Sequence, residues 1–132
     1  MSTETYLLDT HALLFWAMRV EMPESLIAAL DEYQTQGRLF ASAANFWEIA
    51  LLVQKGRIEL TDVKQWKDEL LAHTSIQLLT PDADNMIASV QLPPHHKDPF
   101  DRLIIAQAFA HKCVLVSKDG LFKAYGVPLL WL

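Results

Sequence analysis

The sequence contains a single cysteine, and it lacks the motifs of several common enzyme classes. Cys113 lies in the apolar segment CVLV. We therefore expect a buried, reduced thiol, which fits a cytoplasmic location. No apolar run reaches the roughly 18 residues that a membrane span needs, and the opening residues MSTETYLLD show no export signal. The absence of a glycine-rich phosphate loop, a G-x-S-x-G motif and a Cys–His pattern disfavours nucleoside triphosphate hydrolysis and covalent catalysis.

The overall composition is that of one globular domain. The chain has 132 residues, of which 52% are hydrophobic and 20% are charged, so it can bury a core without crosslinks. Its net charge of −5 argues against a general nucleic-acid coat protein. A local basic groove remains compatible with that charge, and the candidates for it are Arg19, Lys55, Arg57, Lys97 and Lys123.

Short apolar segments alternate with amphipathic ones along the chain. The pattern predicts strands at 5–9, 38–42, 75–80, 113–119 and 128–132, and helices at 10–18, 23–36, 43–55, 61–74, 81–90 and 99–111. Nearly apolar strands separated by helices indicate a parallel sheet covered on both faces. We therefore predict that residues 1–132 form a single α/β domain, a three-layer α/β/α sandwich with four or five parallel strands. Sites in such folds form beyond the carboxyl ends of the strands.

The segment HHKDPFDRLIIAQA places two aspartates in front of a long apolar helix. Asp98 suits the N-cap, Pro99 suits the first helical position, and Asp101 lies where a carboxylate can reach back to the cap. Both charges also oppose the positive end of the helix dipole. Capping alone explains this motif, so a chemical role for Asp101 requires partners elsewhere in the chain.

Other acidic residues occur at positions where the predicted fold would gather them. Asp9 ends the first strand, Asp119 closes the strand that follows the Asp101 helix, and Glu48 interrupts an apolar helix three residues after Asn45. Each has a structural alternative: Asp9 can cap a helix, Glu48 can reach solvent, and Asp119 with the following glycine can form a turn. Together, however, the four acids would meet at one edge of the sheet.

Four carboxylates at one sheet edge favour a divalent cation. Like charges repel and raise one another's pKa unless a cation is present. Oxygen ligands without thiolates suit Mg²⁺ or Mn²⁺, and the five histidines show no zinc-ligand spacing. Carboxylates with a bound metal can activate water and hydrolyse phosphodiesters.

Four motifs carry a resemblance to a known family. LLDTHALLFW, SAANFWEIALLVQKGRIEL, LPPHHKDPFDRLIIAQA and LVSKDGLFKAYGV occur in the order and spacing of a PIN domain. They most resemble the VapC-type toxin ribonucleases of toxin–antitoxin pairs. The resemblance implies a PIN-like sheet of order 3-2-1-4-5 and an endoribonuclease that uses Mg²⁺ or Mn²⁺. It also implies a homodimer and a cognate antitoxin.

The resemblance assigns the family's four acids to Asp9, Glu48, Asp101 and Asp119. It implies that the three aspartates contact metal, and that Glu48 binds metal or acts as the base toward the attacking water. Asp98 mainly caps its helix and can support the ligands.

Residues close to these acids are candidates for supporting roles. Asn45 and Ser42 are expected to support or cap, and Ser42, Ser117 and Thr10 are candidates for a hydroxyl near the site. Arg102 and Lys118 can meet an RNA phosphate or pair with the neighbouring acids.

The sequence is also compatible with two other functions. A phospho-accepting receiver domain has a similar size and fold, but it needs paired aspartates after its first strand and an acceptor aspartate after its third, whereas Glu48 lies in a helix. A non-catalytic PIN-like binding module is the other alternative. A surface for the antitoxin is predicted on the first two helices, from Phe15, Trp16, Leu26 or Ile27, although residues at this helical spacing more often belong to the core.

Overall fold

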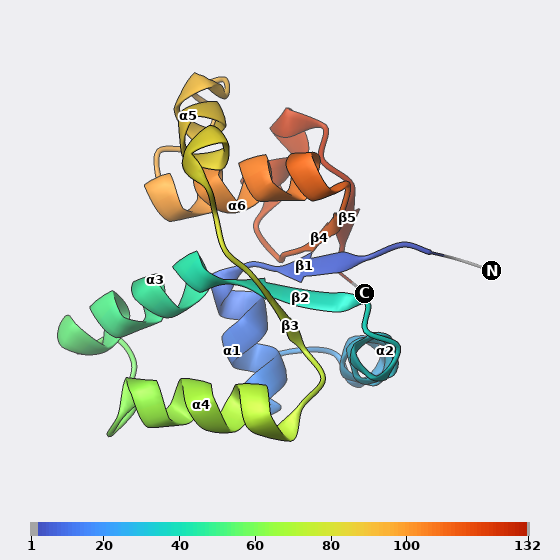
Figure 1. The fold of residues 1–132 in the computed structure, drawn as a ribbon, viewed down its shortest axis with the longest axis vertical. Helices are drawn as coiled ribbons and strands as arrows, with labels where there is room; N and C mark the ends of the chain where they lie inside the picture. The colour runs from blue at the N-terminus through green and yellow to red at the C-terminus, as the bar shows by residue number, and fades with distance from the viewer. Residues whose placement is uncertain (1–2, 132) are drawn as a thin grey trace.

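The computed structural model describes residues 3–131, which fold around one parallel sheet (Figure 1). The strands are β1 (Tyr6–Leu8), β2 (Leu39–Ser42), β3 (Gln77–Leu79), β4 (Val114–Val116) and β5 (Leu129–Leu130). The helices are α1 (Thr10–Met18), α2 (Glu24–Thr35), α3 (Ala43–Gln54), α4 (Val63–His73), α5 (Ala83–Gln91) and α6 (Pro99–His111), with a 3-10 helix η1 (Gly120–Tyr125).

The strand order is β3-β2-β1-β4-β5, and every pair is parallel. The central strand β1 sets the register, because Tyr6 lies opposite both Leu39 and Val114. The predicted order and the parallel pairing are therefore confirmed.

Alternate residues of β1 face two separate apolar clusters, as the two-residue period of a strand requires. Tyr6 and Leu8 join a cluster with α1, α2, α3 and α4, whereas Leu7 packs with α6, β4 and η1. Figure 1 shows α1, α2 and α4 on one side of the sheet and α5 and α6 on the other. The predicted three-layer sandwich is confirmed.

The strands are shorter than the apolar pattern predicts, and one element is new. The predicted strand 113–119 ends at Val116, because Ser117 turns its hydroxyl to Asp9 and accepts the Asp119 N–H. Asp119 then accepts the Leu121 N–H and caps η1, where the Asp-Gly pair had suggested only a turn. Cys113 is buried and free, as expected.

Among residues 3–131, no helix is both long enough and apolar enough to span a membrane.

The antitoxin surface predicted on the first two helices is wrong for two of its residues. Trp16 is only 2% exposed and Leu26 is fully buried. Phe15 and Ile27 are partly buried against the same core cluster. The indole N–H of Trp16 also donates to Asp31 at 2.9 Å, which ties α1 to α2. Helical spacing marks the apolar face but does not say whether a neighbour covers it.

Candidate active site

The carboxyl edge of the sheet gathers the four predicted acids. Asp9 follows β1, Asp119 follows β4, Asp101 lies in the first turn of α6, and Glu48 lies within α3. A cavity of about 310 Å³ is lined by Asp9, Asp101 and Asp119, and a neighbouring cleft of about 440 Å³ is lined by Glu48. Both are lined by His11, so they meet at that residue. The four positions identified from the sequence therefore lie around one site.

Asp9 serves as a helix cap and as a site residue at once. Its Oδ1 accepts the Ala12 N–H at 2.8 Å, and its Oδ2 accepts the Ser117 hydroxyl at 2.6 Å. The side chain is 6% exposed, and burial raises its pKa although both hydrogen bonds lower it. Ser117 thus holds Asp9 in place, which is one of the hydroxyl roles considered above.

A buried polar network positions α3 and Glu48. Ser42 caps the helix, and the Asn45 side chain accepts the Ser42 N–H at 2.7 Å and donates to the Thr10 hydroxyl at 3.0 Å. This places Asn45 in a capping box and ties α3 to α1. Ser42, Asn45 and Thr10 therefore position the site residues.

Glu48 is a buried acid whose carboxylate is only partly hydrogen-bonded. It is 9% exposed, and its Oε1 has no hydrogen-bond partner in the described structure. Burial raises the pKa of its carboxyl, the Thr10 hydroxyl opposes this, and the charge of Asp98 raises it further. A buried carboxylate oxygen without a partner is costly. A cation or a water proton at this position would satisfy it.

Asp98 caps α6 as predicted, but the expected reciprocal bond from Asp101 does not form. The Asp98 carboxylate accepts the Phe100 N–H at 2.8 Å and the Asp101 N–H at 3.4 Å. The Asp98 N–H donates instead to Nδ1 of His96 at 3.1 Å. The Asp101 carboxylate is therefore not used by the cap and turns toward the other acids. Its pKa rises to about 8, through burial and the charges of Asp98, Glu48, Asp9 and Asp119.

His96 is a site residue that the sequence reasoning missed. Its Nε2 lies 3.0 Å from Asp119 Oδ2 and 3.1 Å from Asp101 Oδ2. Donor atoms of these three residues lie within 4.8 Å of one another, a spacing that could hold a metal ion. The adjacent histidines do diverge, since His95 is exposed and packs its ring edge-on against Tyr125. One feature of the sequence could have identified His96 as a site residue, namely its position two residues before the N-cap of α6.

Arg102 binds backbone carbonyls and does not pair with the neighbouring acids, and its contact with RNA stays a prediction. Its guanidinium donates to the backbone carbonyls of Val90, Leu92, Pro93 and His96, at 2.8 to 3.1 Å. It therefore holds the loop between α5 and α6 and contributes no salt bridge to the acids. Lys118 is exposed and lines the cavity that contains Asp9, Asp101 and Asp119.

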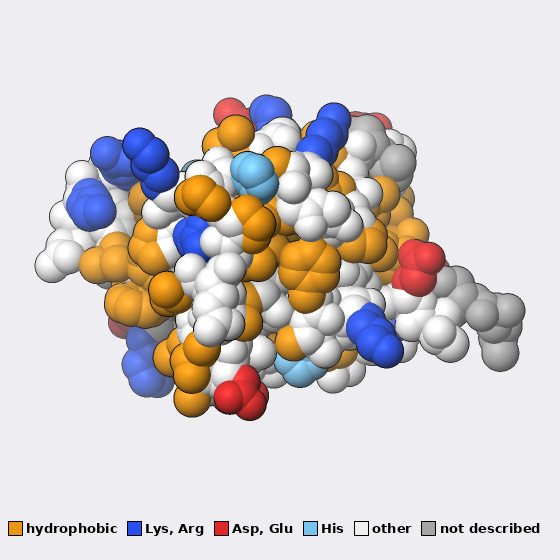
Figure 2. All heavy atoms as spheres, turned by 90° about the horizontal axis from the view of Figure 1, so that it is seen from above, with side chains coloured by type: hydrophobic (Ala, Val, Ile, Leu, Met, Phe, Trp, Pro, Cys, Tyr) orange, Lys and Arg blue, Asp and Glu red, His pale blue; other side chains and the backbone are white. Residues whose placement is uncertain are grey.

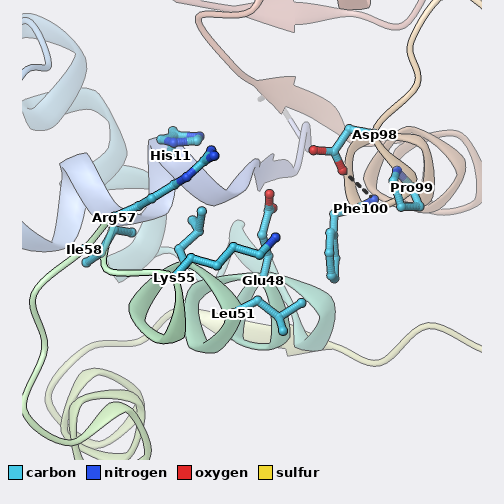
Figure 3. A pocket seen from close by; sticks show the side chains of 10 residues that line it. His11, Glu48, Leu51, Lys55, Arg57, Ile58, Asp98, Pro99 and Phe100 are labelled. Atoms are coloured by element: carbon cyan, nitrogen blue, oxygen red, sulfur yellow. Dashed lines mark hydrogen bonds between the residues drawn. The ribbon is translucent and has the colours of Figure 1, made fainter.

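Basic side chains line the cleft next to Glu48. Lys55 and Arg57 come from the end of α3 and the loop after it, and in Figure 3 both reach toward the space between His11 and Glu48. Phe100 and Pro99 form the opposite wall (Figure 3). Arg19, another candidate, pairs with Asp31 instead. The structure thus retains part of the proposed basic groove, despite the net charge of −5.

Comparison with known proteins identifies the family. The family model of the PIN domain matches residues 6–128. The chain belongs to the PIN-domain family. This PIN domain is 32% identical over 127 residues to Ribonuclease VapC22 of Mycobacterium tuberculosis, with 94% of each chain covered. A receiver domain is therefore excluded.

Solved structures share the fold at lower identity. DNA-bound VapBC from Salmonella typhimurium matches with a TM-score of 0.71 and 17% identity, over 97% of this chain and 98% of that one. FitAcB from Neisseria gonorrhoeae matches with a TM-score of 0.69 and 22% identity, over 96% of each chain. At this identity the likeness concerns the fold, which agrees with the strand order of this PIN domain.

Proposed function

We propose that this PIN domain is an endoribonuclease that depends on Mg²⁺ or Mn²⁺ and acts as the toxin of a toxin–antitoxin pair. One observation carries the proposal: four carboxylates from four separate elements meet at one edge, and the buried Oε1 of Glu48 has no hydrogen-bond partner among residues 3–131. Such a cluster is electrostatically unfavourable without a cation. Its ligand atoms are oxygens, which Mg²⁺ and Mn²⁺ prefer. The similarity to a ribonuclease supports RNA as the substrate.

The four acids are proposed to have different roles in catalysis. Asp9, Asp101 and Asp119 are proposed to hold the metal, and Ser117 and the α1 N-terminus orient Asp9. A bound divalent metal lowers the pKa of a coordinated water and neutralises charge on the phosphate. Glu48 offers its unpartnered Oε1 either to the metal or to a proton of the attacking water. Either role uses the same buried oxygen.

RNA is proposed to enter along the cleft between α3 and α6. Lys55 and Arg57 on one wall supply positive charge for a phosphate, and Lys118 adds a further ammonium beside the aspartates. Phosphate contacts of this kind release counterions, so binding weakens as salt rises. We expect Lys55→Ala with Arg57→Ala to weaken RNA binding and to flatten its salt dependence, as measured by fluorescence anisotropy in Mg²⁺-free buffer.

The test of the activity is cleavage of total cellular RNA by the purified chain. We expect discrete products with Mg²⁺ or Mn²⁺, no products with chelator, and none from Asp9→Asn. Asparagine caps helices about as well as aspartate, so this variant keeps the fold. Asp62→Asn is the matched control, because Asp62 is also an N-cap but lies at the start of α4.

Two outcomes would count against the nuclease. Products that persist in Asp9→Asn would point to a contaminating enzyme or to a different site. An absence of cleavage by folded, antitoxin-free protein on every RNA tested would favour the non-catalytic PIN-like binding module.

A cognate antitoxin and a second copy of this chain are the proposed partners, and a cytoplasmic location stays a prediction. Figure 2 views the molecule from the α5 end, where many hydrophobic side chains are exposed. Those on α5 are Met86, Ile87 and Val90, exposed by 51%, 56% and 77%. We assign this face to the contact between two copies. Val90→Glu should then shift the protein toward monomer in analytical ultracentrifugation.

A further inference from the structure

Every polar group of His96 has a partner in the structure. Its N–H donates to the Tyr125 hydroxyl at 2.8 Å, and its carbonyl accepts from Arg102 at 3.1 Å. Nδ1 accepts the Asp98 N–H at 3.1 Å, and Nε2 lies within hydrogen-bond distance of two carboxylates. The ring also packs against Phe122, with centroids 5.5 Å apart. The surroundings therefore determine both the place and the orientation of this imidazole.

The contact with Asp98 decides which ring nitrogen carries the proton. A backbone N–H can only donate, so Nδ1 must present its lone pair to Asp98. In a neutral imidazole the proton then resides on Nε2. A nitrogen that carries a proton cannot ligate a metal, although the three-residue cluster by its spacing alone suggests a ligand.

We propose that His96 is a positioning residue rather than a metal ligand: its Nε2–H donates to Asp119 and lies 3.1 Å from Asp101, and it thereby holds these two metal-binding carboxylates together. This inference rests on the proposed metal-dependent function. Asp101 lies in the first turn of α6 and Asp119 follows the end of β4, so the two carboxylates come from separate elements. A donor between the two carboxylates offsets part of their repulsion.

The hydrogen bonds around the loop explain how His96 reaches this position. Arg102 donates to the carbonyls of both Pro93 and His96, and the Tyr125 hydroxyl accepts from His96 and donates to Pro93 at 2.9 Å. Arg102 and Tyr125 thus hold the backbone of the loop from both sides. The α6 N-cap then sets the ring through the Asp98 N–H.

The first experiment reads the tautomer directly in the metal-free protein. Nitrogen chemical shifts of histidine side chains distinguish a protonated from an unprotonated ring nitrogen, and His96→Gln assigns the signals. We expect Nδ1 of His96 to be unprotonated and Nε2 to carry the proton, because the Asp98 N–H occupies Nδ1. The opposite tautomer would overturn the proposal, whether or not the protein cleaves RNA.

The second experiment measures Mn²⁺ binding by calorimetry. His96→Gln places an amide N–H near the position of Nε2, so its affinity should remain within about threefold of the original. His96→Ala removes the donor and should weaken Mn²⁺ by about tenfold or more, as loss of a group that orients ligands does. His95→Gln is the control, because His95 is exposed, and it should bind normally.

Electron paramagnetic resonance of bound Mn²⁺ separates a donor from a ligand. With ¹⁵N-labelled histidine, we expect no coupling from a directly bonded nitrogen. A coupling that disappears in His96→Gln would overturn the proposal, as would unchanged Mn²⁺ affinity in folded His96→Ala. If the original protein binds neither Mn²⁺ nor Mg²⁺, the metal-dependent function fails, and the tautomer experiment decides the donor geometry by itself.

Discussion

The fold raises the pKa of three carboxyl groups at the site, so these groups keep their protons at a higher pH than they would in water. Burial raises the pKa of Asp9, Glu48 and Asp101, and for Asp101 the value reaches about 8. The charges of Asp98, Glu48, Asp9 and Asp119 also raise the pKa of Asp101. Carboxyl groups in such a site keep their protons until a bound cation displaces them. Metal binding is therefore expected to release protons and to strengthen as pH rises toward 8.

The same shift predicts how the metal-free protein responds to pH. Unfolded Asp101 ionises near its ordinary value of 3.8, but folded Asp101 keeps its proton up to about pH 8. Between these values the unfolded state binds fewer protons, so the free energy of unfolding falls as pH rises. Asp101→Asn removes this titration and should flatten the fall, with higher stability at neutral pH.

Urea denaturation with chelator at a series of pH values measures this effect. The α6 cap remains intact in Asp101→Asn, because the cap uses the Asp98 carboxylate and the backbone N–H of residue 101. Equal pH slopes for the original protein and the variant would contradict the prediction. Activity should be lost in the variant at every pH.

At the scale of elements, the loop from α5 to α6 depends on one guanidinium. Arg102 donates to the Val90 carbonyl at the end of α5 and to three carbonyls of this loop, through a planar fork of donors that lysine does not offer. Arg102→Lys should therefore speed amide hydrogen exchange at residues 92–98 and weaken Mn²⁺ binding. Lys97→Ala, in the same loop, is the control and should leave both unchanged. Unaltered exchange in Arg102→Lys would show that the loop is held by other contacts.

The packing of α1 against α2 makes Trp16 a core residue. Its ring is 2% exposed and its N–H is bonded to Asp31 on α2. We therefore expect Trp16→Ala to lower the free energy of unfolding by about 3–5 kcal/mol, the range for removal of a large core aromatic. Chemical denaturation measures it. If the free energy of unfolding fell by less than about 1 kcal/mol, Trp16 would not be a core residue and would again be a candidate for the antitoxin surface.

At the scale of the whole molecule, the parallel sheet determines that the acids meet. The carboxyl ends of β1 and β4 lie side by side, and α3 and α6 begin at the same edge. A ligand that binds the folded site and not the unfolded chain stabilises the whole domain. Mn²⁺ at about 100 times its Kd should raise the free energy of unfolding by about 2.7 kcal/mol.

Thermal unfolding with Mn²⁺ and with chelator measures this stabilisation. It should vanish in Asp101→Asn and persist in Asp62→Asn, which alters a cap away from the site. A Tm that does not respond to Mn²⁺ or Mg²⁺ in the original protein would contradict the metal site.

The sequence by itself determined the helices, the strand order and the positions of four acids at the carboxyl edge, but it did not determine the ends of the strands or the 3-10 helix η1. Helices α1 and α6 begin and end where their caps and apolar patterns place them, because these signals act within a few residues. The strand order and the acids came from motifs whose spacing resembles the PIN family. Asp98 was likewise readable as a cap, since its partners are its own neighbours in the chain.

Only the tertiary structure decided which side chains are covered and which distant groups meet. Trp16 and Leu26 became core because α1 and α2 pack beneath the sheet, a contact that helical periodicity does not reveal. His96 became part of the site because Arg102 and Tyr125 hold its loop, so that its ring lies between Asp101 and Asp119. Hydrogen bonds between residues far apart in the chain depend on the assembled fold, and no local pattern encodes them.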